Sequence, residues 1–254
     1  MISAPEIAVL LVVALLGHAM ALLWLMADRY GWSICEKTIY NLPIPQEQIN
    51  REIKNSIHTP IHAVMLAGCL YLGCFNATGW GSFAVSLVLT ALWAEIWHYW
   101  SHRAFHIRQL HWIHLEHHKS RVNSPFTAIS FSFTEKLVFN VGILGFLVLV
   151  DLVYSLNFFG VGSWYIAYLF INSFSHANFE LKSEKFLKWT GRFITTTTYH
   201  SLHHSRYTGN YGLGTRFMDQ MFRTEWEDYE PLYEQITSER KPLSKLREKA
   251  GTPQ

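Results

Sequence analysis

The residues most able to carry out chemistry in this 254-residue chain are its histidines, of which there are 14. His98 and His102 stand four residues apart in HYWSH, and two further segments, HLEHH and HSLHH, share the pattern His-x-x-His-His. On a helix, residues i, i+3 and i+4 lie on one face, so each segment can direct two or three imidazoles at one point. With His176, which ends an apolar stretch, the candidate metal ligands are His98, His102, His114, His117, His118, His176, His200, His203 and His204.

Imidazole is a typical ligand of iron, copper and zinc, whereas calcium and magnesium prefer oxygen ligands. Nine histidines exceed what one metal ion takes, so the set predicts a centre of two metals. The competing interpretation is that headgroups or backbone groups satisfy each histidine at a membrane surface, which explains one histidine better than the whole set. The three cysteines form no CxxC pair, so we predict neither a thiolate zinc site nor a disulfide framework.

Glu95, one helical turn before His98, has two interpretations. It lies in an apolar stretch, where an ionised group is costly unless it is paired. It either ligates a metal or orients a ligand through the ring nitrogen that the metal leaves free, or it forms an ion pair with Arg103 or Lys119. The sequence leaves both interpretations open.

Other residues near the candidate ligands can support them. Asn172 lies one turn before His176 on the same helical face, and His106 extends the face of His102 as a ligand or a supporting group. Asp219 is expected to anchor the last histidine segment. The remaining histidines are first interpreted as structural: His18, His58, His62 and His111.

Five apolar stretches could position these groups, because each is long enough to cross a ~30 Å hydrocarbon core, which takes about 20 helical residues. They cover residues 7–26, 57–75, 83–100, 137–154 and 158–175. The second is the weakest, because it is rich in glycine and opens with Thr59-Pro60. The first lacks a preceding basic segment and is too long for the apolar part of a signal peptide. We therefore predict an all-α polytopic membrane protein with about four to five transmembrane helices and a histidine-rich helical cap.

The basic residues orient this arrangement in the membrane. All 21 Lys and Arg residues fall between the first and second stretches, between the third and fourth, or after the fifth. With five spans these segments share one side, which the positive-inside rule identifies as the cytosol. The candidate histidines lie on the same side. We therefore expect an integral membrane protein with its active site on the cytosolic face, in a bacterial inner membrane or in an endoplasmic reticulum.

The composition agrees with a membrane protein of one domain. Hydrophobic residues make up 50% of the chain and charged residues only 16%, against ~25% in soluble domains. A net charge of +2 gives no reason to expect a nucleic-acid partner. We expect an N-terminal transmembrane and loop region (1–92), a catalytic region that forms one domain with those helices (93–226) and a polar tail (227–254). The run GNYGLG at 209–214 lacks the spacing of a phosphate loop and is interpreted as a turn.

Three segments, HYWSHRAFH, HWIHLEHHKS and YHSLHHSRYTGNYG, resemble the histidine blocks of the fatty-acid hydroxylase/sterol desaturase superfamily, and the resemblance covers residues 93–225. SHANFEL followed by TTTTYHSLHH is similar to the branch of plant wax-aldehyde (alkane-forming) proteins and their bacterial relatives. Met218 and Arg223 depart from the usual closing motif. Some members carry a histidine where this chain has Asn172, and the comparison makes Asn172 a weak or water-mediated ligand.

The resemblance implies O₂-dependent oxidation of an unactivated C–H bond in a sterol or fatty-acyl lipid by hydroxylation, desaturation or demethylation. It implies two iron ions, with zinc as the alternative metal, and O₂ as co-substrate. The protein would supply ligands, a dry cavity and placement of the substrate. The chain shows no haem-binding HPGG motif and no nucleotide fingerprint. We therefore expect electrons from a separate donor protein of the cytochrome or ferredoxin type.

Two other classes of protein also use histidines. One is a histidine-rich membrane metal transporter or metal-binding protein without oxidase activity. Transporter sites typically lie near the bilayer midplane on broken helices, whereas these histidines cluster at or beyond the ends of the apolar stretches. The other is a zinc hydrolase, which needs fewer histidines and a clear general base.

Overall fold

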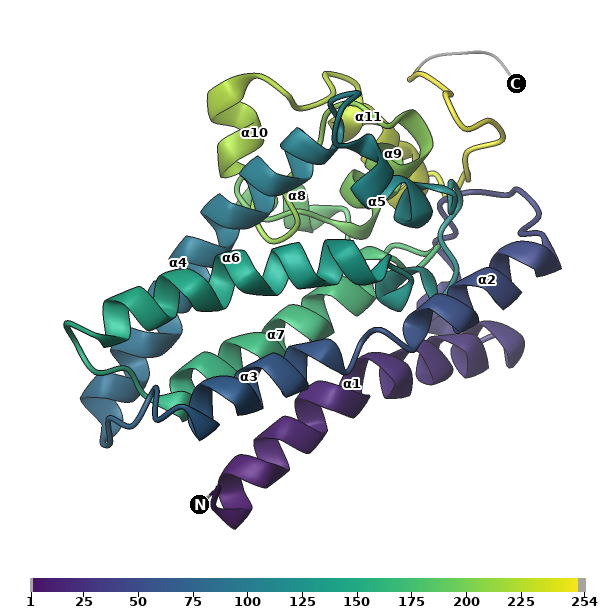
Figure 1. Ribbon diagram of the computed structural model, residues 1–254. Helices are drawn as coiled ribbons and strands as arrows, with labels where there is room; N and C mark the ends of the chain where they lie inside the picture. Colours follow the sequence, from purple (N-terminus) through teal and green to yellow (C-terminus); the bar gives the residue numbers. More distant parts are fainter. Residues whose placement is uncertain (1, 251–254) are drawn as a thin grey trace.

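The computed structural model describes residues 2–250, and these form helices joined by loops, without a β-strand (Figure 1). The long helices form a bundle: α1 (Ala4–Arg29), α3 (Ile61–Tyr71), α4 (Trp80–Phe105), α6 (Phe133–Asp151) and α7 (Phe158–Ser175). Shorter helices surround one end of it: α2 (Gln46–Ser56), α5 (His111–His118), α8 (Lys185–Trp189), α9 (Thr197–Arg206), α10 (Phe217–Phe222) and α11 (Tyr229–Thr237). Two 3₁₀ turns, η1 (Ser33–Cys35) and η2 (Thr127–Ile129), lie in the connections. The predicted all-α fold is confirmed.

Three of the described helices, α1, α4 and α6, are long and apolar enough to cross a membrane. This number is smaller than the four to five spans predicted from the sequence. The stretch 57–75 forms only the 11-residue helix α3 after Pro60, and at 1.5 Å per residue this helix extends about 16 Å. Helix α7, which has 18 residues and contains tyrosines, serines and Asn172, is not among these three.

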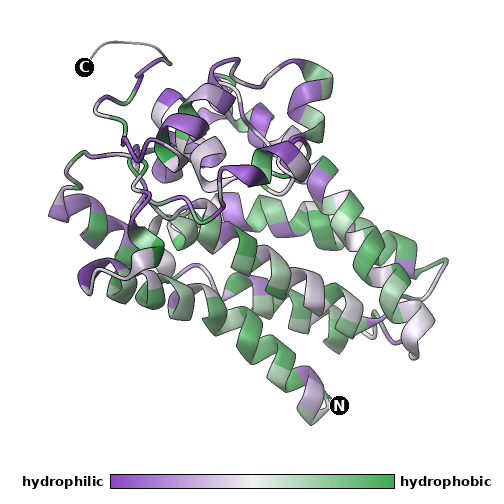
Figure 2. Cartoon of the chain, turned by 180° about the vertical axis from the view of Figure 1, so that it is seen from behind, coloured by the Kyte–Doolittle hydropathy of each residue, from purple (hydrophilic) through white to green (hydrophobic). Residues whose placement is uncertain are grey.

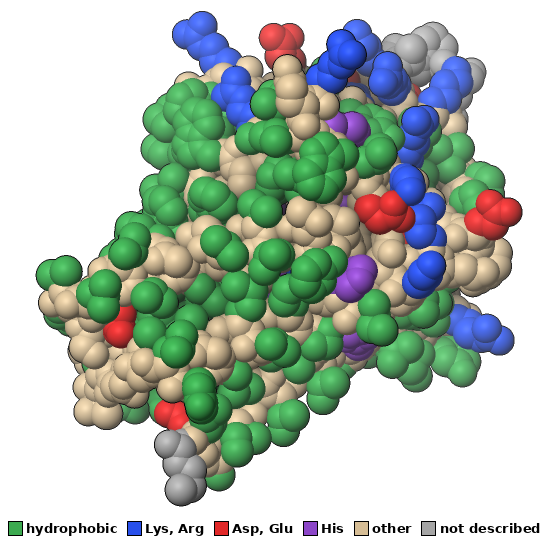
Figure 3. Space-filling view, in the orientation of Figure 1, with side chains coloured by type: hydrophobic (Ala, Val, Ile, Leu, Met, Phe, Trp, Pro, Cys, Tyr) green, Lys and Arg blue, Asp and Glu red, His purple; other side chains and the backbone are tan. Residues whose placement is uncertain are grey.

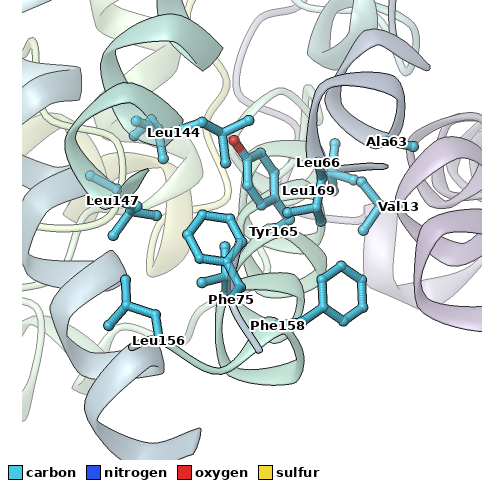
Figure 4. Close-up of a cluster of buried hydrophobic side chains, with 13 residues drawn as sticks. Val13, Ala63, Leu66, Phe75, Leu144, Leu147, Leu156, Phe158, Tyr165 and Leu169 are labelled. Atoms are coloured by element: carbon cyan, nitrogen blue, oxygen red, sulfur yellow. The ribbon is translucent and has the colours of Figure 1, made fainter. Parts of the chain in front are cut away.

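Apolar packing holds the bundle together. α1 packs against α3 and α7, and α4 packs against α6 and α7. Between them lies a cluster of buried side chains that includes Leu66, Leu144 and Tyr165 (Figure 4). The outer faces are apolar as well, with Leu15 60% and Val88 56% exposed. Helices that are apolar all round are typical of membrane spans, so the bundle is that of an integral membrane protein.

Polar and basic residues concentrate at one end of the molecule. The long helices are largely apolar, whereas the short helices and loops around α9 and α11 are mostly polar (Figure 2). On the face shown in Figure 3, Lys and Arg side chains gather at this polar end, and the end that carries the N-terminus shows none. The long helices thus lead from an apolar region into a basic cap, which the positive-inside rule predicts to face the cytosol.

Helix α7 approaches α4 closely at Gly160. A Cβ atom at this position would lie 2.5 Å from the backbone oxygen of Phe83 and 2.8 Å from the Cβ of Ser86. Because the obstacle includes backbone, the two helices would have to move apart to accept any side chain. The glycine therefore sets the separation of the helices that carry His102 and His176.

We expect Gly160→Ala to lower the free energy of unfolding by about 1–3 kcal/mol, as overpacking of a close interface does. The measurement is the thermal unfolding midpoint of protein purified in detergent. Gly145→Ala in α6 is the matched control, because a Cβ there meets no atom within 4 Å and alanine is the better helix former. Equal midpoints for the two variants would contradict the close contact.

Candidate metal centre

Four segments meet at the polar end of the bundle and bring the candidate ligands together. They are the last turn of α4, helix α5, the C-terminal cap of α7 and helix α9. Helix α9 begins where the hydroxyl of Thr196 accepts a hydrogen bond from the backbone N–H of Tyr199 at 3.2 Å, which is a typical N-cap. Helices as short as α5 and α9 are marginal alone, so packing among these segments maintains them.

The histidines form two groups, and within each group the ring nitrogens lie within 4.8 Å of one another. The first group consists of His102, His106, His114, His118 and His203. The second group consists of His117, His176, His200 and His204. The groups adjoin, because ring centroids across them approach to 4.9 Å between His118 and His204 and to 5.1 Å between His114 and His117.

The two groups contain eight of the nine ligands predicted from the sequence, and His106 as well. His98 lies outside both groups, with its ring centroid 5.1 Å from that of His102 and its Nε2 buried without a hydrogen-bond partner. His98, His102 and His106 share a face of α4 at successive turns, which step about 6 Å along the axis. The last two therefore reach the level of α5 and α9, and His98 remains one turn deeper in the bundle.

Backbone carbonyls hold the rings of five histidines in place. In each case Nδ1 donates to a carbonyl oxygen: His102 to Tyr211 at 2.7 Å, His117 to Ser130 at 3.0 Å, His176 to Asn172 at 2.7 Å, His203 to Gly209 at 2.8 Å and His204 to Ser120 at 2.9 Å. A carbonyl oxygen only accepts hydrogen bonds, so Nδ1 carries the proton. In the neutral ring Nε2 then keeps its lone pair, which is the form that binds a metal.

A carboxylate holds the ring of His114. Its Nδ1 contacts Oε1 of Glu135, and both side chains are buried. A carboxylate partner fixes the orientation of an imidazole and makes its other nitrogen a stronger metal ligand. Sequence reasoning missed Glu135, because Ser132-x-x-Glu135 fits the ordinary start of a helix. Ser132 does cap α6, and nothing in this local pattern points to a partner 21 residues away.

The Nε2 atoms of the second group face one another at short range. They are 3.1 Å apart between His117 and His176, and 3.0 Å apart between His176 and His200. Burial lowers the pKa of His117 far below its usual value and that of His176 to about 4, so both rings are neutral near pH 7. Two lone pairs at this distance repel each other unless a cation lies between them.

These separations match those of ligands on one metal ion. Two nitrogens that each lie ~2.1 Å from a metal, at right angles, are about 3 Å apart. In the first group the Nε2 atoms of His118 and His203 are also 3.0 Å apart, and Nε2 of His114 is buried without a hydrogen-bond partner. The donor atoms of both groups therefore fit bound metal ions.

Asp219 anchors the loop between α9 and α10 (residues 207–216, the α9–α10 loop). Its Oδ1 accepts from the backbone N–H of Tyr211 at 2.9 Å, and its Oδ2 accepts from that of Gly212 at 2.6 Å and from the hydroxyl of Tyr199 at 2.9 Å. The run 209–214 is thus a loop rather than a phosphate site, and it supplies the carbonyls that hold His102 and His203.

Glu95 and Asn172 contact the centre indirectly. Oε2 of Glu95 accepts from the backbone N–H and the hydroxyl of Thr215 at 3.1 and 2.8 Å. In the part of the chain that the structure describes, no histidine or basic residue forms a hydrogen bond or an ion pair with Glu95. It therefore ties α4 to the α9–α10 loop. The side chain of Asn172 donates to the carbonyl of Ala128 at 2.5 Å, and its own carbonyl holds His176.

The histidines interpreted as structural lie outside both groups. His18 lies 3.2 Å from the hydroxyl of Ser56, and Nδ1 of His58 and of His111 contacts a backbone carbonyl. His62 differs from these, because it lies between Asn140 and Lys136 in the interior of the bundle.

A cavity of about 40 Å³ adjoins both groups on their bundle side. Its walls combine histidines of the two groups, such as His102 and His176, with aromatic rings and with Glu135, Lys136 and His62. Lys136 is 4% exposed, and its amine lies 3.4 Å from Nε2 of His62 and 4.4 Å from the ring centroid of Phe131. The cavity therefore places a buried amine beside the candidate metal ligands.

Comparison with known proteins bears on this geometry. The model of the fatty acid hydroxylase family matches residues 87–224, which include every member of both groups. The chain is similar to very-long-chain aldehyde decarbonylase GL1-4 of Oryza sativa subsp. indica, with 31% identity over 226 residues, covering 84% of this chain and 36% of that protein. It is also similar to Protein CER1-like 2 of Arabidopsis thaliana, with 28% identity over 234 residues, covering 84% and 36%. The chain thus spans about a third of these relatives, and no solved structure matches it.

We expect His106→Ala to make one of two bound metal ions easier to remove, because it takes one ring from the first group. The measurement is the metal content per chain after mild chelation of protein purified from iron-replete cells. His111→Ala is the matched control, since His111 lies in the same part of the chain but outside both groups, with its Nδ1 on the carbonyl of Phe105. Equal metal retention in the two variants would show that His106 is not a ligand.

Proposed function

The chain belongs to the fatty acid hydroxylase family, and from this we propose that it is a membrane-embedded, O₂-dependent di-iron oxidoreductase that hydroxylates or desaturates a lipid. The observation that carries the proposal is the pair of adjoining histidine groups, whose Nε2 atoms face one another at ligand-to-ligand distances. The proposed ligands are the nine members of these groups: His102, His106, His114, His117, His118, His176, His200, His203 and His204. His98 is kept as a proposed ligand from the sequence alone, because it lies outside both groups. Zinc is the alternative metal.

Bound iron would activate O₂ for oxidation of a C–H bond, with electrons from a separate donor protein of the cytochrome or ferredoxin type. The residues of the chain have simpler tasks. The carbonyls behind His102, His117 and His176 fix the tautomer and the direction of these rings before any metal binds. Each of these three rings is at least 96% buried, so the centre is shielded from water, which favours oxidation of an apolar substrate.

The cavity beside the groups supports a proposal for the reacting end of the substrate. Its volume of about 40 Å³ is far below the ~300–1,000 Å³ of pockets that enclose a whole small-molecule ligand, so it suits the end group of a lipid and not a whole lipid. Lys136 lines this cavity with amine hydrogens to spare, and an ionisable residue inside a membrane helix usually serves function. We therefore favour a long-chain lipid with an oxygen at its reacting end. The relatives named as very-long-chain aldehyde decarbonylases make an aldehyde the first candidate.

The basic cap supports a cytosolic position of the centre, in a bacterial inner membrane or an endoplasmic reticulum. Lys and Arg residues are absent from 55–102 and from 137–181, the segments that hold most of α3, α4, α6 and α7. A soluble electron donor could then approach the cap from the aqueous side, whereas the substrate would come from the hydrocarbon side.

The function is tested in cells that express the protein under ¹⁸O₂ and receive labelled long-chain aldehydes, fatty acids or sterols. We expect the wild type to convert one class of lipid, with ¹⁸O gained, a double bond formed or the chain shortened. His117→Ala/His203→Ala, which removes one ring from each group, should abolish the change. A protein that binds two metals and changes no lipid would instead support the alternative of a metal transporter or metal-binding protein.

Lys136→Met should weaken the binding of an oxygen-ended lipid about tenfold, because it removes a hydrogen bond from an amine worth ~1.5 kcal/mol. Binding of the alkane of equal length should not change, since methionine preserves the apolar stem. The measurement is displacement of a fluorescent fatty probe from the purified protein by octadecanol, octadecanal and octadecane. Lys119→Met on the surface is the control. If wild type and Lys136→Met discriminate equally between octadecanal and octadecane, Lys136 does not bind the end group.

A further inference from the structure

Three of the four rings in the second group depend on one loop. This α5–α6 loop (residues 119–132) follows His118 and precedes α6. Its Ser120 carbonyl accepts from Nδ1 of His204, and its Ser130 carbonyl accepts from Nδ1 of His117. Its Ala128 carbonyl accepts from the side chain of Asn172, the residue whose own carbonyl holds His176. The geometry of the second group is therefore set by how firmly this loop is held.

The loop has little regular structure of its own, and one buried carboxylate joins its parts. Glu52, on helix α2, accepts at Oε1 from the hydroxyls of Ser120 at 2.6 Å and Thr127 at 2.9 Å. Its Oε2 accepts from the hydroxyl of Ser124. These hydroxyls come from the beginning and the middle of the loop, so a single side chain fixes points seven residues apart.

The neighbouring turn of α2 adds to this contact. Gln48 donates from Nε2 to Oε1 of Glu52 and to the carbonyl of Val122 in the loop, both at 2.8 Å. Asn55, on the next turn, donates to the hydroxyl of Ser130 at 3.4 Å. Residues 48, 52 and 55 repeat at helical spacing, so one face of α2 lies along the loop.

The environment of Glu52 indicates that its carboxylate serves as a hydrogen-bond acceptor for the loop and does not merely fill space. Its side chain is completely buried, and no Lys or Arg within residues 2–250 forms an ion pair with it. A buried carboxylate is costly and persists only where hydrogen bonds satisfy it. Here four donors converge on its two oxygens, and three of them belong to the loop. The two oxygens of a carboxylate can accept all four of these hydrogen bonds, and an apolar side chain could accept none.

We propose that Glu52 is the positioning residue of the second histidine group, acting through the α5–α6 loop on His117, His204 and His176. Glu52 lies outside the segment that matches the fatty acid hydroxylase family, residues 87–224. Helix α2 thus acts as a brace outside that segment. The inference rests on the proposed metal centre, and it predicts a selective effect: without Glu52 the second group loses affinity for metal and the first group does not.

The main experiment titrates metal-free protein with Co²⁺ and follows both sites by calorimetry and by the visible absorption of bound Co²⁺. Glu52→Ala should weaken one of the two sites about 10–100-fold, which is the usual cost of losing a residue that supports a ligand. Glu52→Gln keeps an oxygen that accepts from Ser120 and Thr127, and it should recover most of the affinity. Glu135→Gln provides the reciprocal case, because Glu135 holds His114 of the first group and should weaken the other site.

Glu116→Ala is the matched control. Glu116 also contacts α2, through Asn55 and Arg51, and pairs with Lys119 at the start of the loop, but it bonds no loop hydroxyl and no histidine. It should leave both Co²⁺ sites unchanged. Thr127→Val removes one of the hydroxyls that bond Glu52 at nearly constant volume. It should weaken Co²⁺ binding at the same site as Glu52→Ala, but by less, and it replaces Glu52→Ala in the experiment if that variant does not fold.

A second readout needs no metal. Hydrogen exchange in the metal-free protein should be faster in residues 120–130 of Glu52→Ala than of wild type, with no change in the α9–α10 loop. Wild-type affinity at both sites in Glu52→Ala, equal loss at both sites, or no recovery in Glu52→Gln would overturn the proposal. If wild type binds no metal, the proposed metal centre fails, whereas exchange in residues 120–130 still decides whether Glu52 holds the loop.

Discussion

The structure depends on one electrostatic constraint, the close approach of neutral imidazole nitrogens inside the protein. Nε2 of His117 and Nε2 of His176 lie 3.1 Å apart, and both rings donate their proton on the opposite side to a backbone carbonyl. Turning a ring to relieve the repulsion would leave that buried carbonyl without a donor, which costs about 1–3 kcal/mol. A cation between the nitrogens satisfies both requirements, so the polypeptide maintains an arrangement that only a metal stabilises fully.

Each group relies on a loop that is gathered around a buried carboxylate. In the first group, Asp219 binds the backbone of Tyr211 and Gly212, and this loop presents the carbonyls that hold His102 and His203. In the second, Glu52 binds hydroxyls of the α5–α6 loop, which presents carbonyls to His117 and His204. The arrangement separates two tasks. Backbone carbonyls orient the histidine rings without adding a charge beside them. The carboxylates of Asp219 and Glu52 bond the loops and not the histidines.

The sequence could predict what depends on local spacing. The His-x-x-His-His segments do form short helices with their rings on one side, and the basic residues do gather at one end. It could not show which turn of α4 lies beside α5 and α9. For this reason it could not show that His106 joins the first group while His98 lies one turn deeper in the bundle. Nor could it show that residues 57–75 form a helix of 11 residues, because hydropathy does not reveal where Pro60 lets the helix begin. Glu52 and Glu135 were missed for a further reason: their partners lie 21 to 75 residues away.

The two histidine groups lie where the long apolar helices end and the short polar helices begin. His102 lies in the last turn of α4 and His176 caps the C-terminal end of α7. The long helices are largely apolar, and the short helices and loops beside them are mostly polar (Figure 2). At a site deeper in the bundle, the loops that orient the ligands would lie within the hydrocarbon region of the membrane. Each of their backbone N–H and C=O groups would then need a partner, because an unpaired one costs several kcal/mol there. A site farther into the cap would lose the apolar cavity that adjoins both groups. The boundary is therefore where nine converging histidines, their carbonyl supports and the adjoining cavity can be accommodated together.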